Sequence, residues 1–425
     1  MTGIVLNEKS LQKAALAVAV LWVVVQIVLI ACFWGYPQKT DMGHYISMAQ
    51  RCFNNGQWYP MAEDVYSAYI VTPGLINYLI LQLHIFGTVN FNAVLNLFLN
   101  ISMLLEVYYL GQKFFSKRTG LISVIIFCLL YSNLLVVLGA NTENSFLFLC
   151  LSALCLVFSG KWKYIVLAAV LFALANWVRP LVIIFLFASI VYFIITKTRF
   201  YNYIALIIPY ILVLFIMGTL TERKIGYFVY QSTTSGINLL MTSHDKAKGN
   251  AYLFGTNDVD FIENGNLVTF AEKDSIWKAR AITWIKENPA RYAALFFIKI
   301  PALYIHDAWA YTSHWSDLSS VEFLSGTGKV SKNVFIKKLA KQALQSIPYY
   351  LTFLLFLYAL WINRKKILNV KSIFLVIFIS GTFITCIFPV MPRYHYPFMF
   401  TVIIYAAWGL DTFIERKKIT ETTRS

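Results

Sequence analysis

The chain has 425 residues, of which 59% are hydrophobic and only 13% charged, and its mean hydropathy is +0.63. Soluble domains carry about twice this share of charge, and many apolar runs approach the ~20 residues that cross a bilayer. This composition excludes a soluble globular domain. It predicts an all-α polytopic membrane protein, because an outer-membrane barrel would show short alternating segments instead.

The net charge of +16 would suggest a nucleic-acid partner in a soluble protein. Here the basic residues gather in short loops between apolar runs, which is typical of topology signals and contacts with anionic lipids. We therefore expect membrane lipids and no nucleic acid as partners. The basic loops contain Lys113, Lys117 and Arg118; Lys161 and Lys163; Lys197 and Arg199; Arg364, Lys365 and Lys366; and Arg416, Lys417 and Lys418.

The first apolar run extends from Ala14 to about Trp34 and follows Lys9 and Lys13. These lysines predict a cytoplasmic N-terminus, and the run is too long for the core of a signal peptide. The next part, residues 35–90, forms a first outer loop with a short amphipathic helix over residues 41–54. Residues 72–87 are apolar but short. We expect them to lie along the interface, since a crossing there would place the basic loop at Lys113 outside.

The remaining runs predict about ten spans in total, joined by short basic or polar turns. Residues 220–290 form a polar outer loop, and Lys299 and Pro301 interrupt the apolar stretch 291–305, which we predict to be a second interfacial or re-entrant helix. The predicted later spans are 91–111, 120–138, 143–159, 163–177, 181–196, 200–219, 346–362, 371–390 and 396–412.

Three regions follow from this pattern. Residues 1–219 are predicted to be a transmembrane catalytic core of about seven spans. Residues 220–345 form the outer loop region with its interfacial helix. Residues 346–425 form a C-terminal transmembrane region of about three spans and a cytoplasmic tail.

Asp41 is the acidic residue at the outer mouth of the first span, and Tyr45 lies four positions later on the same helical face, with His44 beside it. A carboxylate at this place could act as the general base on an acceptor hydroxyl. The alternative is that Asp41 caps the helix that follows, since Asp is a favoured N-cap. Both roles can hold together.

Three further charged residues stand at the predicted outer boundary. Glu143 opens a span, where a carboxylate stabilises the helix dipole or could assist catalysis by orienting a sugar or holding a metal. Arg179 and Arg393 run against the rule that outer segments are poor in arginine. Flanked by proline and aromatic residues, they suit bidentate phosphate binding, whereas the simpler alternative is an interfacial anchor.

Weaker signals are found in the later loops. Asn238 in the segment Ser235–Leu240 and Tyr394 beside Arg393 are candidate substrate-binding residues, together with His44 and Tyr45. The set His306, Asp307, His314 and Asp317 fits no strong metal template, so the metal stays unknown.

Several short stretches, in order along nearly the whole chain, resemble the GT-C superfamily of glycosyltransferases. The chain is more closely similar to the bacterial branch related to protein O-mannosyltransferases and to the aminoarabinose transferase of lipid A (glycosyltransferase family 39-like). The stretches that carry this likeness are residues 41–45 (Asp-Met-Gly-His-Tyr), 72–75 (Thr-Pro-Gly-Leu), 114–118 (Phe-Phe-Ser-Lys-Arg), 141–143 (Asn-Thr-Glu), 177–180 (Trp-Val-Arg-Pro), 284–289 (Trp-Ile-Lys-Glu-Asn-Pro) and 392–394 (Pro-Arg-Tyr).

This resemblance implies a GT-C-like core and an inverting transfer from a polyprenyl-phosphate sugar donor to a glycan, lipid or protein on the outer side of a bacterial cell membrane. The acid implied as catalytic is Asp41, supported by Glu143. Met42 replaces a second acid of the family, which speaks against a tightly held divalent cation, although no cofactor is certain. Val71 stands where the family has lysine, so Arg179 and Arg393 take the donor phosphate.

Two other functions fit parts of the pattern. A lipid-linked sugar flippase or permease would explain the arginines and aromatics, but it should place ionisable residues at mid-membrane depth, where this chain has few. A polysaccharide polymerase shares the large outer loop. It uses a pyrophosphate-linked oligosaccharide, so a donor assay separates it from the transferase.

Overall fold

The computed structural model describes residues 7–249, 260–310, 332–366 and 369–422. Within these ranges the chain is helical and has no strand, which confirms the predicted all-α fold class. The α-helices of the first half are α1 (Glu8–Cys32), α2 (Thr40–Asn54), α3 (Pro73–Phe86), α4 (Asn92–Phe114), α5 (Lys117–Leu129), α6 (Tyr131–Leu135), α7 (Thr142–Phe158), α8 (Trp162–Val178), α9 (Ile183–Ile195) and α10 (Phe200–Ile225).

The second half contains the helices of the outer loop region, then the C-terminal helices. These are α11 (Ser235–Leu240), α12 (Phe270–Glu287), α13 (Pro289–Leu303), α16 (Lys332–Gln345), α17 (Ile347–Ile362), α18 (Ile373–Ile387) and α19 (Met399–Thr422). Short 3-10 helices among the connections include η1 (Ala62–Tyr66) and η3 (Val136–Leu138) in the first half and η7 (Pro392–Phe398) in the second.

Five helices in the described ranges are long and apolar enough to cross a membrane, or six if one bent pair counts as a single span. The five begin at Glu8, Val89, Phe200, Val370 and Pro392. Four other predicted spans coincide with the shorter apolar helices α7, α8, α9 and α17. The chain is therefore a multi-pass membrane protein, as its composition predicts.

The predicted span 120–138 is wrong as a straight helix. Its two parts, residues 117–129 and 131–138, meet at 69°. The break has a polar cause: Asn133 Nδ2 donates to the carbonyl of Phe127 at 2.8 Å, and the backbone N–H of Ser132 donates to Asp307 Oδ2 at 3.0 Å. These bonds satisfy backbone groups that a bend leaves open inside an apolar region.

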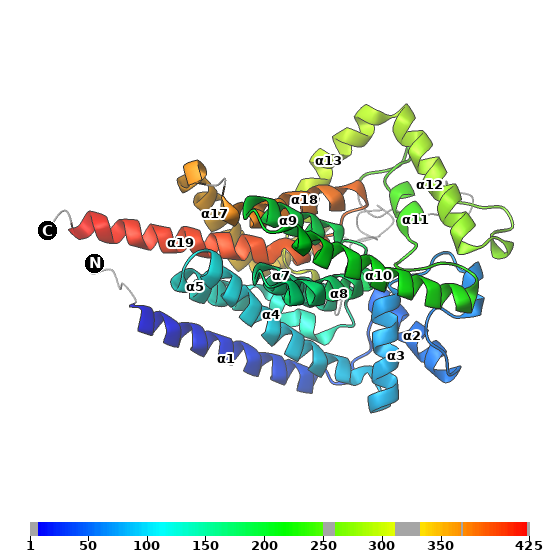
Figure 1. The fold of residues 1–425 in the computed structure, drawn as a ribbon, viewed down its shortest axis with the longest axis horizontal. Helices are drawn as coiled ribbons and strands as arrows, with labels where there is room; N and C mark the ends of the chain where they lie inside the picture. The colour runs from blue at the N-terminus through cyan, green and yellow to red at the C-terminus, as the bar shows by residue number, and fades with distance from the viewer. Residues whose placement is uncertain (1–6, 250–259, 311–331, 367–368, 423–425) are drawn as a thin grey trace.

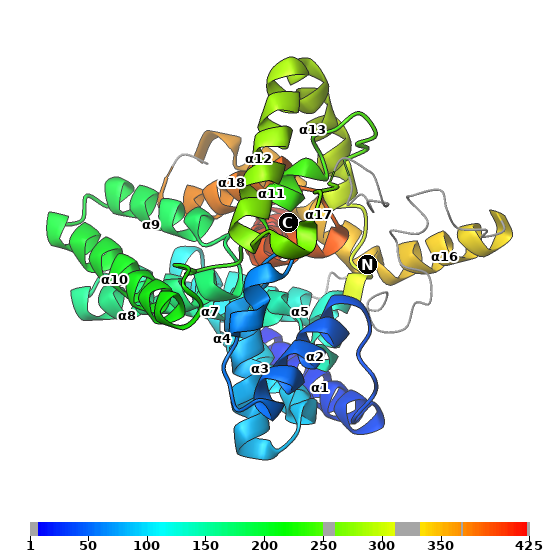
Figure 2. The same cartoon turned by 90° about the vertical axis from the view of Figure 1, so that its right-hand side faces the viewer.

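The helices form one bundle rather than separate units. Figure 1 shows the start of α1 and the end of α19 at one end, with α2, α3, α11 and α12 at the other, which we term the loop end. Seen from the loop end, α12 and α13 project to one side and α2 and α3 to the other (Figure 2).

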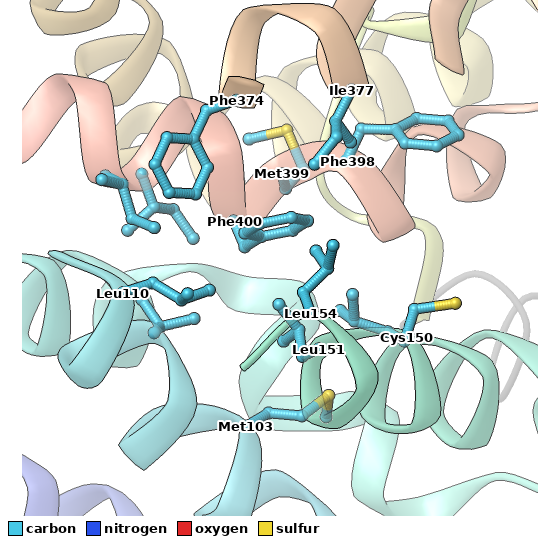
Figure 3. Close-up of a cluster of buried hydrophobic side chains, with 14 of the residues drawn as sticks. Met103, Leu110, Cys150, Leu151, Leu154, Phe374, Ile377, Phe398, Met399 and Phe400 are labelled. Atoms are coloured by element: carbon cyan, nitrogen blue, oxygen red, sulfur yellow. The ribbon is translucent and has the colours of Figure 1, made fainter. Parts of the chain in front are cut away.

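The core joins helices of the first half of the chain to the C-terminal helices. α4 and α7 supply Met103, Leu110, Leu151 and Leu154, and Figure 3 shows them facing a C-terminal group that contains Phe374, Ile377, Phe398, Met399 and Phe400. Because η7 and α19 are packed into this core, the position of η7 relative to α7 is fixed by buried apolar contacts.

Candidate active site

Asp41 lies in the first turn of α2 at the loop end, with a side chain that is 47% exposed. It does not cap the helix: the N-cap is Lys39, which makes no side-chain capping bond. The capping interpretation is therefore wrong. The carboxylate instead forms an ion pair with the guanidinium of Arg393 on η7.

Arg393 is one member of a chain of four charges. Its Nε lies 3.7 Å from Glu143 Oε1, and the same oxygen lies 2.7 Å from Arg179 Nη1. The order Asp41, Arg393, Glu143, Arg179 thus alternates in sign. Four residues that the sequence marked as candidates, from four distant segments, meet at one place.

Aromatic rings complete this charged group. The guanidinium carbons of Arg179 and Arg393 lie 5.2 and 5.4 Å from the centroid of the Tyr394 ring. Both distances are within the range of cation–π attraction. Burial and the Asp41 charge raise the pKa of Tyr45, so its hydroxyl stays protonated. His44 is exposed on α2, with its ring 6.4 Å from that of Tyr45.

The charge of Arg393 determines the state of Asp41. Attraction to this guanidinium outweighs partial burial and lowers the pKa of the Asp41 carboxyl below its ordinary value. His44 and Arg179 act in the same direction with smaller effects. Asp41 is therefore ionised at neutral pH, as a proton acceptor must be.

The motif at residues 72–75 positions Arg179. Thr72 Oγ1 donates to the carbonyl of Val178 at 2.8 Å, and the backbone at Gly74 approaches Trp177 and Val178 so closely that a Cβ there would lie 2.8 Å from both. Thr72 has a φ of +31° and Thr40, directly before Asp41, one of +57°. Left-handed backbone is unfavourable for a β-branched residue, and such strain often accompanies functional sites.

A row of asparagines on α4 holds the segment that leads to Glu143. Asn96 Nδ2 donates to the carbonyls of Val137 and Gly139 at 3.2 and 2.8 Å, and Asn92 Nδ2 donates to Gly139 at 3.2 Å. We did not predict this role. The spacing of Asn92, Asn96 and Asn100, one helical turn apart inside an apolar run, is the sequence signal that could have indicated it.

Asp307 and His395 fix η7 from its buried side. His395 Nδ1 lies 2.8 Å from the carbonyl oxygen of Leu303, and its Nε2 lies 3.8 Å from Asp307 Oδ1. Asp307, considered above as a metal ligand, accepts a hydrogen bond from the backbone N–H of Ser132. His314 and Asp317 lie outside the described residues. Among the residues that are described, no group of three or more His, Cys, Asp and Glu side chains is arranged to hold a metal ion.

An apolar cavity of about 740 Å³ lies between α3, α7, α8 and α10. Ser145 and Val178 are among its lining residues, one two positions after Glu143 and the other directly before Arg179 in the chain. Lys224 lines it as well and donates to the carbonyl of Trp58. The cavity thus offers an apolar volume whose lining includes the chain neighbour of Arg179.

Asn238 is not among the residues that these contacts join. It lies on α11, which is bound to α12 through the Gly236 N–H and Asp274 Oδ1 at 2.5 Å. A substrate contact by Asn238 stays a prediction, as do the roles of the other candidates.

Comparison with known proteins agrees with the class inferred from the sequence. Residues 71–221 match the family model of dolichyl-phosphate-mannose-protein mannosyltransferases. This range contains Glu143 and Arg179, whereas Asp41 precedes it and Arg393 follows it. The match confirms the predicted resemblance and supports a GT-C membrane glycosyltransferase. A comparison with curated protein sequences gives no match.

The solved structures similar to this chain include the oligosaccharyltransferase of Archaeoglobus fulgidus. Its apo form is 12% identical, with a TM-score of 0.49, over 96% of this chain and 52% of that one. The form tethered to an acceptor peptide with the NVT sequon is 12% identical over 95% and 50%, with a TM-score of 0.48. The form of this AglB enzyme with an inhibitory peptide and a dolichol-phosphate is 13% identical over 96% and 51%, also with a TM-score of 0.48. The chain spans about half the length of these structures.

Proposed function

We propose that the chain is an inverting glycosyltransferase that moves a sugar from a polyprenyl-phosphate donor to an acceptor hydroxyl on the extracytoplasmic side of a bacterial cell membrane. The observation that supports this most directly is the meeting of a half-exposed carboxylate, Asp41, with two arginines, Arg179 and Arg393, together with an apolar cavity that is lined by Val178, the residue directly before Arg179. Such a transfer requires a proton acceptor, groups that bind a phosphate and a site for a lipid tail, and these three features could supply them.

The two arginines are proposed to hold the donor phosphate. Arg393 Nε is buried, and the Glu143 carboxylate oxygen that faces it lies 3.7 Å away, beyond hydrogen-bond distance. Buried donors usually have acceptors, so this N–H group suits a phosphate oxygen. Charge-assisted bonds to a planar guanidinium are among the stronger protein hydrogen bonds.

The cavity is proposed to take the first isoprene units of the donor. Its lining is mostly apolar, comes from α3, α7, α8 and α10, and includes Val178, which directly precedes Arg179 in the chain. With the phosphate bound at the arginines, the first isoprene units of the tail would lie in this cavity, away from water.

The transfer step follows from this placement. The acceptor hydroxyl oxygen attacks the anomeric carbon, the bond from that carbon to the phosphate oxygen breaks, and the phosphate leaves with the bonding electrons. The hydroxyl proton passes to the Asp41 carboxylate. Arg179 and Arg393 stabilise the charge that develops on the leaving phosphate, and Glu143 keeps both arginines in place.

The test compares Asp41→Asn with Glu63→Gln, which changes an exposed carboxylate of the same loop. Membranes of cells with each variant are analysed for lipid-linked sugars and envelope glycans by mass spectrometry. We expect Asp41→Asn to reduce transfer by at least about 100-fold, the typical contribution of a general base, with one lipid-linked monosaccharide accumulating. Glu63→Gln should behave as wild type.

Near-normal transfer by Asp41→Asn would remove Asp41 from this role. The accumulated donor separates two of the alternatives: a monophosphate-linked sugar supports the transferase, and a pyrophosphate-linked oligosaccharide supports a polymerase. The same experiment, repeated with purified protein and added metal or chelator, determines whether a divalent cation takes part.

A further inference from the structure

The charges of the candidate site cancel. Asp41 and Glu143 carry two negative charges, Arg179 and Arg393 carry two positive ones, and the ion pairs connect all four. A donor phosphate therefore meets arginines that already have partners. To bind Arg393 through both Nε and Nη2, the phosphate has to replace a carboxylate that already faces these atoms.

The solvent exposure of the two carboxylate side chains indicates which one the phosphate can displace. The Glu143 side chain is 3% exposed and is held on its second oxygen by Thr142 Oγ1 at 3.1 Å. Stranding such a buried charge costs several kcal/mol. The Asp41 side chain is 47% exposed, so water can solvate it when it leaves Arg393. Asp41 is the partner that can be displaced.

The geometry of Arg393 favours such an exchange. Tyr394 lies against its guanidinium and against that of Arg179, and the backbone of η7 is fixed by His395. Arg393 can therefore stay in place while its partner changes. Its Nε already lacks a well-directed acceptor within the described ranges, so the phosphate would gain a donor that Asp41 leaves unused.

We propose that Arg393 exchanges partners during the reaction: it holds Asp41 while the site is empty, and the donor phosphate displaces Asp41, which becomes available to accept the proton of the acceptor. This inference rests on the proposed function. It implies an order of events, because the base is engaged until the donor has bound.

The exchange also changes the basicity of Asp41. The groups that face this carboxylate are Arg393 of η7, Arg179 after α8, His44 and Tyr45 of its own helix, and Tyr69 of the first loop. Arg393 has the largest effect and lowers the pKa of Asp41. When the phosphate neutralises this guanidinium, the pKa of Asp41 should rise, and the carboxylate becomes a better base.

The experiment uses the purified full chain and farnesyl phosphate as the probe, with farnesol as a control of the same tail without phosphate. Native mass spectrometry measures binding. A hydrophobic carbodiimide, which reacts with protonated carboxyls, then labels the protein at mildly acidic pH, and peptide mass spectrometry quantifies labelling at Asp41 and, as an internal reference, at Glu63.

We expect farnesyl phosphate to increase labelling of Asp41 several-fold, and up to about tenfold if its pKa rises by about one unit. Farnesol should leave Asp41 labelling unchanged, and Glu63 labelling should stay constant throughout. In Arg393→Gln, labelling of Asp41 should be high from the start and should not respond to the probe. Asp41→Asn should bind farnesyl phosphate more tightly than wild type does.

Two failures are distinguishable. If farnesyl phosphate does not bind more tightly than farnesol, the phosphate site is wrong, and the proposed function falls together with the exchange. If farnesyl phosphate binds but labelling of Asp41 is unchanged or falls, the donor site stands and the exchange of partners is overturned.

Discussion

Glu143 Oε1 and Arg179 Nη1 lie 2.7 Å apart, and this contact joins the first turn of α7 to the residue directly after α8. Both side chains are largely buried, at 3% and 14% exposure. The same oxygen faces Arg393. Glu143 is thus the fixed point of the charged group, and the arginines are arranged around it.

Replacement of Glu143 should therefore affect stability as well as transfer. Glu143→Gln leaves two buried guanidinium groups without this partner, and breaking a buried pair typically costs about 3–5 kcal/mol. Thermal unfolding of the purified protein measures the loss. The double variant Glu143→Gln/Arg179→Gln should lose less stability than the sum of the losses in the two single variants, because each single change leaves a buried charge without its partner. Additive losses would show that the two residues are not coupled.

Asn96 should be needed for the position of Glu143. Asn96→Leu removes a donor from the carbonyls of Val137 and Gly139, and an unsatisfied buried carbonyl costs about 1–3 kcal/mol. The matched control is Asn100→Leu, one turn further on α4, where the amide bonds Gln26 of α1 at 2.8 Å. We expect both variants to lose thermal stability and only Asn96→Leu to lose transfer beyond that loss. If both variants lost the same amount of transfer for each kcal/mol of lost stability, a positioning role for Asn96 would be contradicted.

Gly74 should not tolerate a side chain. A methyl group there would lie 2.8 Å from backbone atoms of Trp177 and Val178, which cannot move aside as a side-chain end can. Gly74→Ala should destabilise the protein by about 1–3 kcal/mol through overpacking and should displace Arg179. Gly265→Ala is the control, since its added methyl meets nothing within 4 Å. Binding of farnesyl phosphate and thermal unfolding, measured for both, check this. A fully active Gly74→Ala would show that the contact is loose.

Lys299 on α13 should make stability rise with pH. Its side chain is fully buried and donates to the carbonyl of Cys386 at 2.9 Å, and burial lowers its pKa from 10.5 to about 8. Between these values the unfolded chain binds more protons than the folded one, so stability increases with pH there, by up to about 3 kcal/mol. Below about pH 8 the full cost of charging the buried amine is present.

Lys299→Met removes this titration. The stability of wild type relative to the variant should therefore rise between about pH 7 and pH 10, as measured by thermal unfolding of both proteins across that range. Parallel curves for the two proteins would mean that the amine is already charged without penalty or is accessible to water.

The sequence predicts the helices well because apolar length determines them. The predicted runs 143–159 and 163–177 differ from α7 and α8 by only one residue at either end. The sequence does not predict the bend after Leu129, because the polar groups that cause this bend include Asp307, which is distant along the chain. The boundary charges Asp41, Glu143, Arg179 and Arg393 could be found because they depart from the usual charge distribution. Their pairing could not, since it depends on how α2, α7, α8 and η7 meet.

The role of the 72–75 motif illustrates the same limit. The sequence offers Thr72 and Gly74 as a loop element near the donor, whereas the structure uses them as a close backbone contact with Trp177 and Val178. A contact between backbones leaves no periodic pattern, so composition and spacing cannot reveal it.

Charge cancellation in the candidate site has a consequence for selectivity. A pair of unpaired arginines would attract any small anion, including inorganic phosphate and sulfate, through long-range Coulomb forces. Here each guanidinium is neutralised by a carboxylate, so an anion without a lipid tail gains too little to displace Asp41. Compounds that compete for this site should therefore need a hydrocarbon chain as well as a negative head.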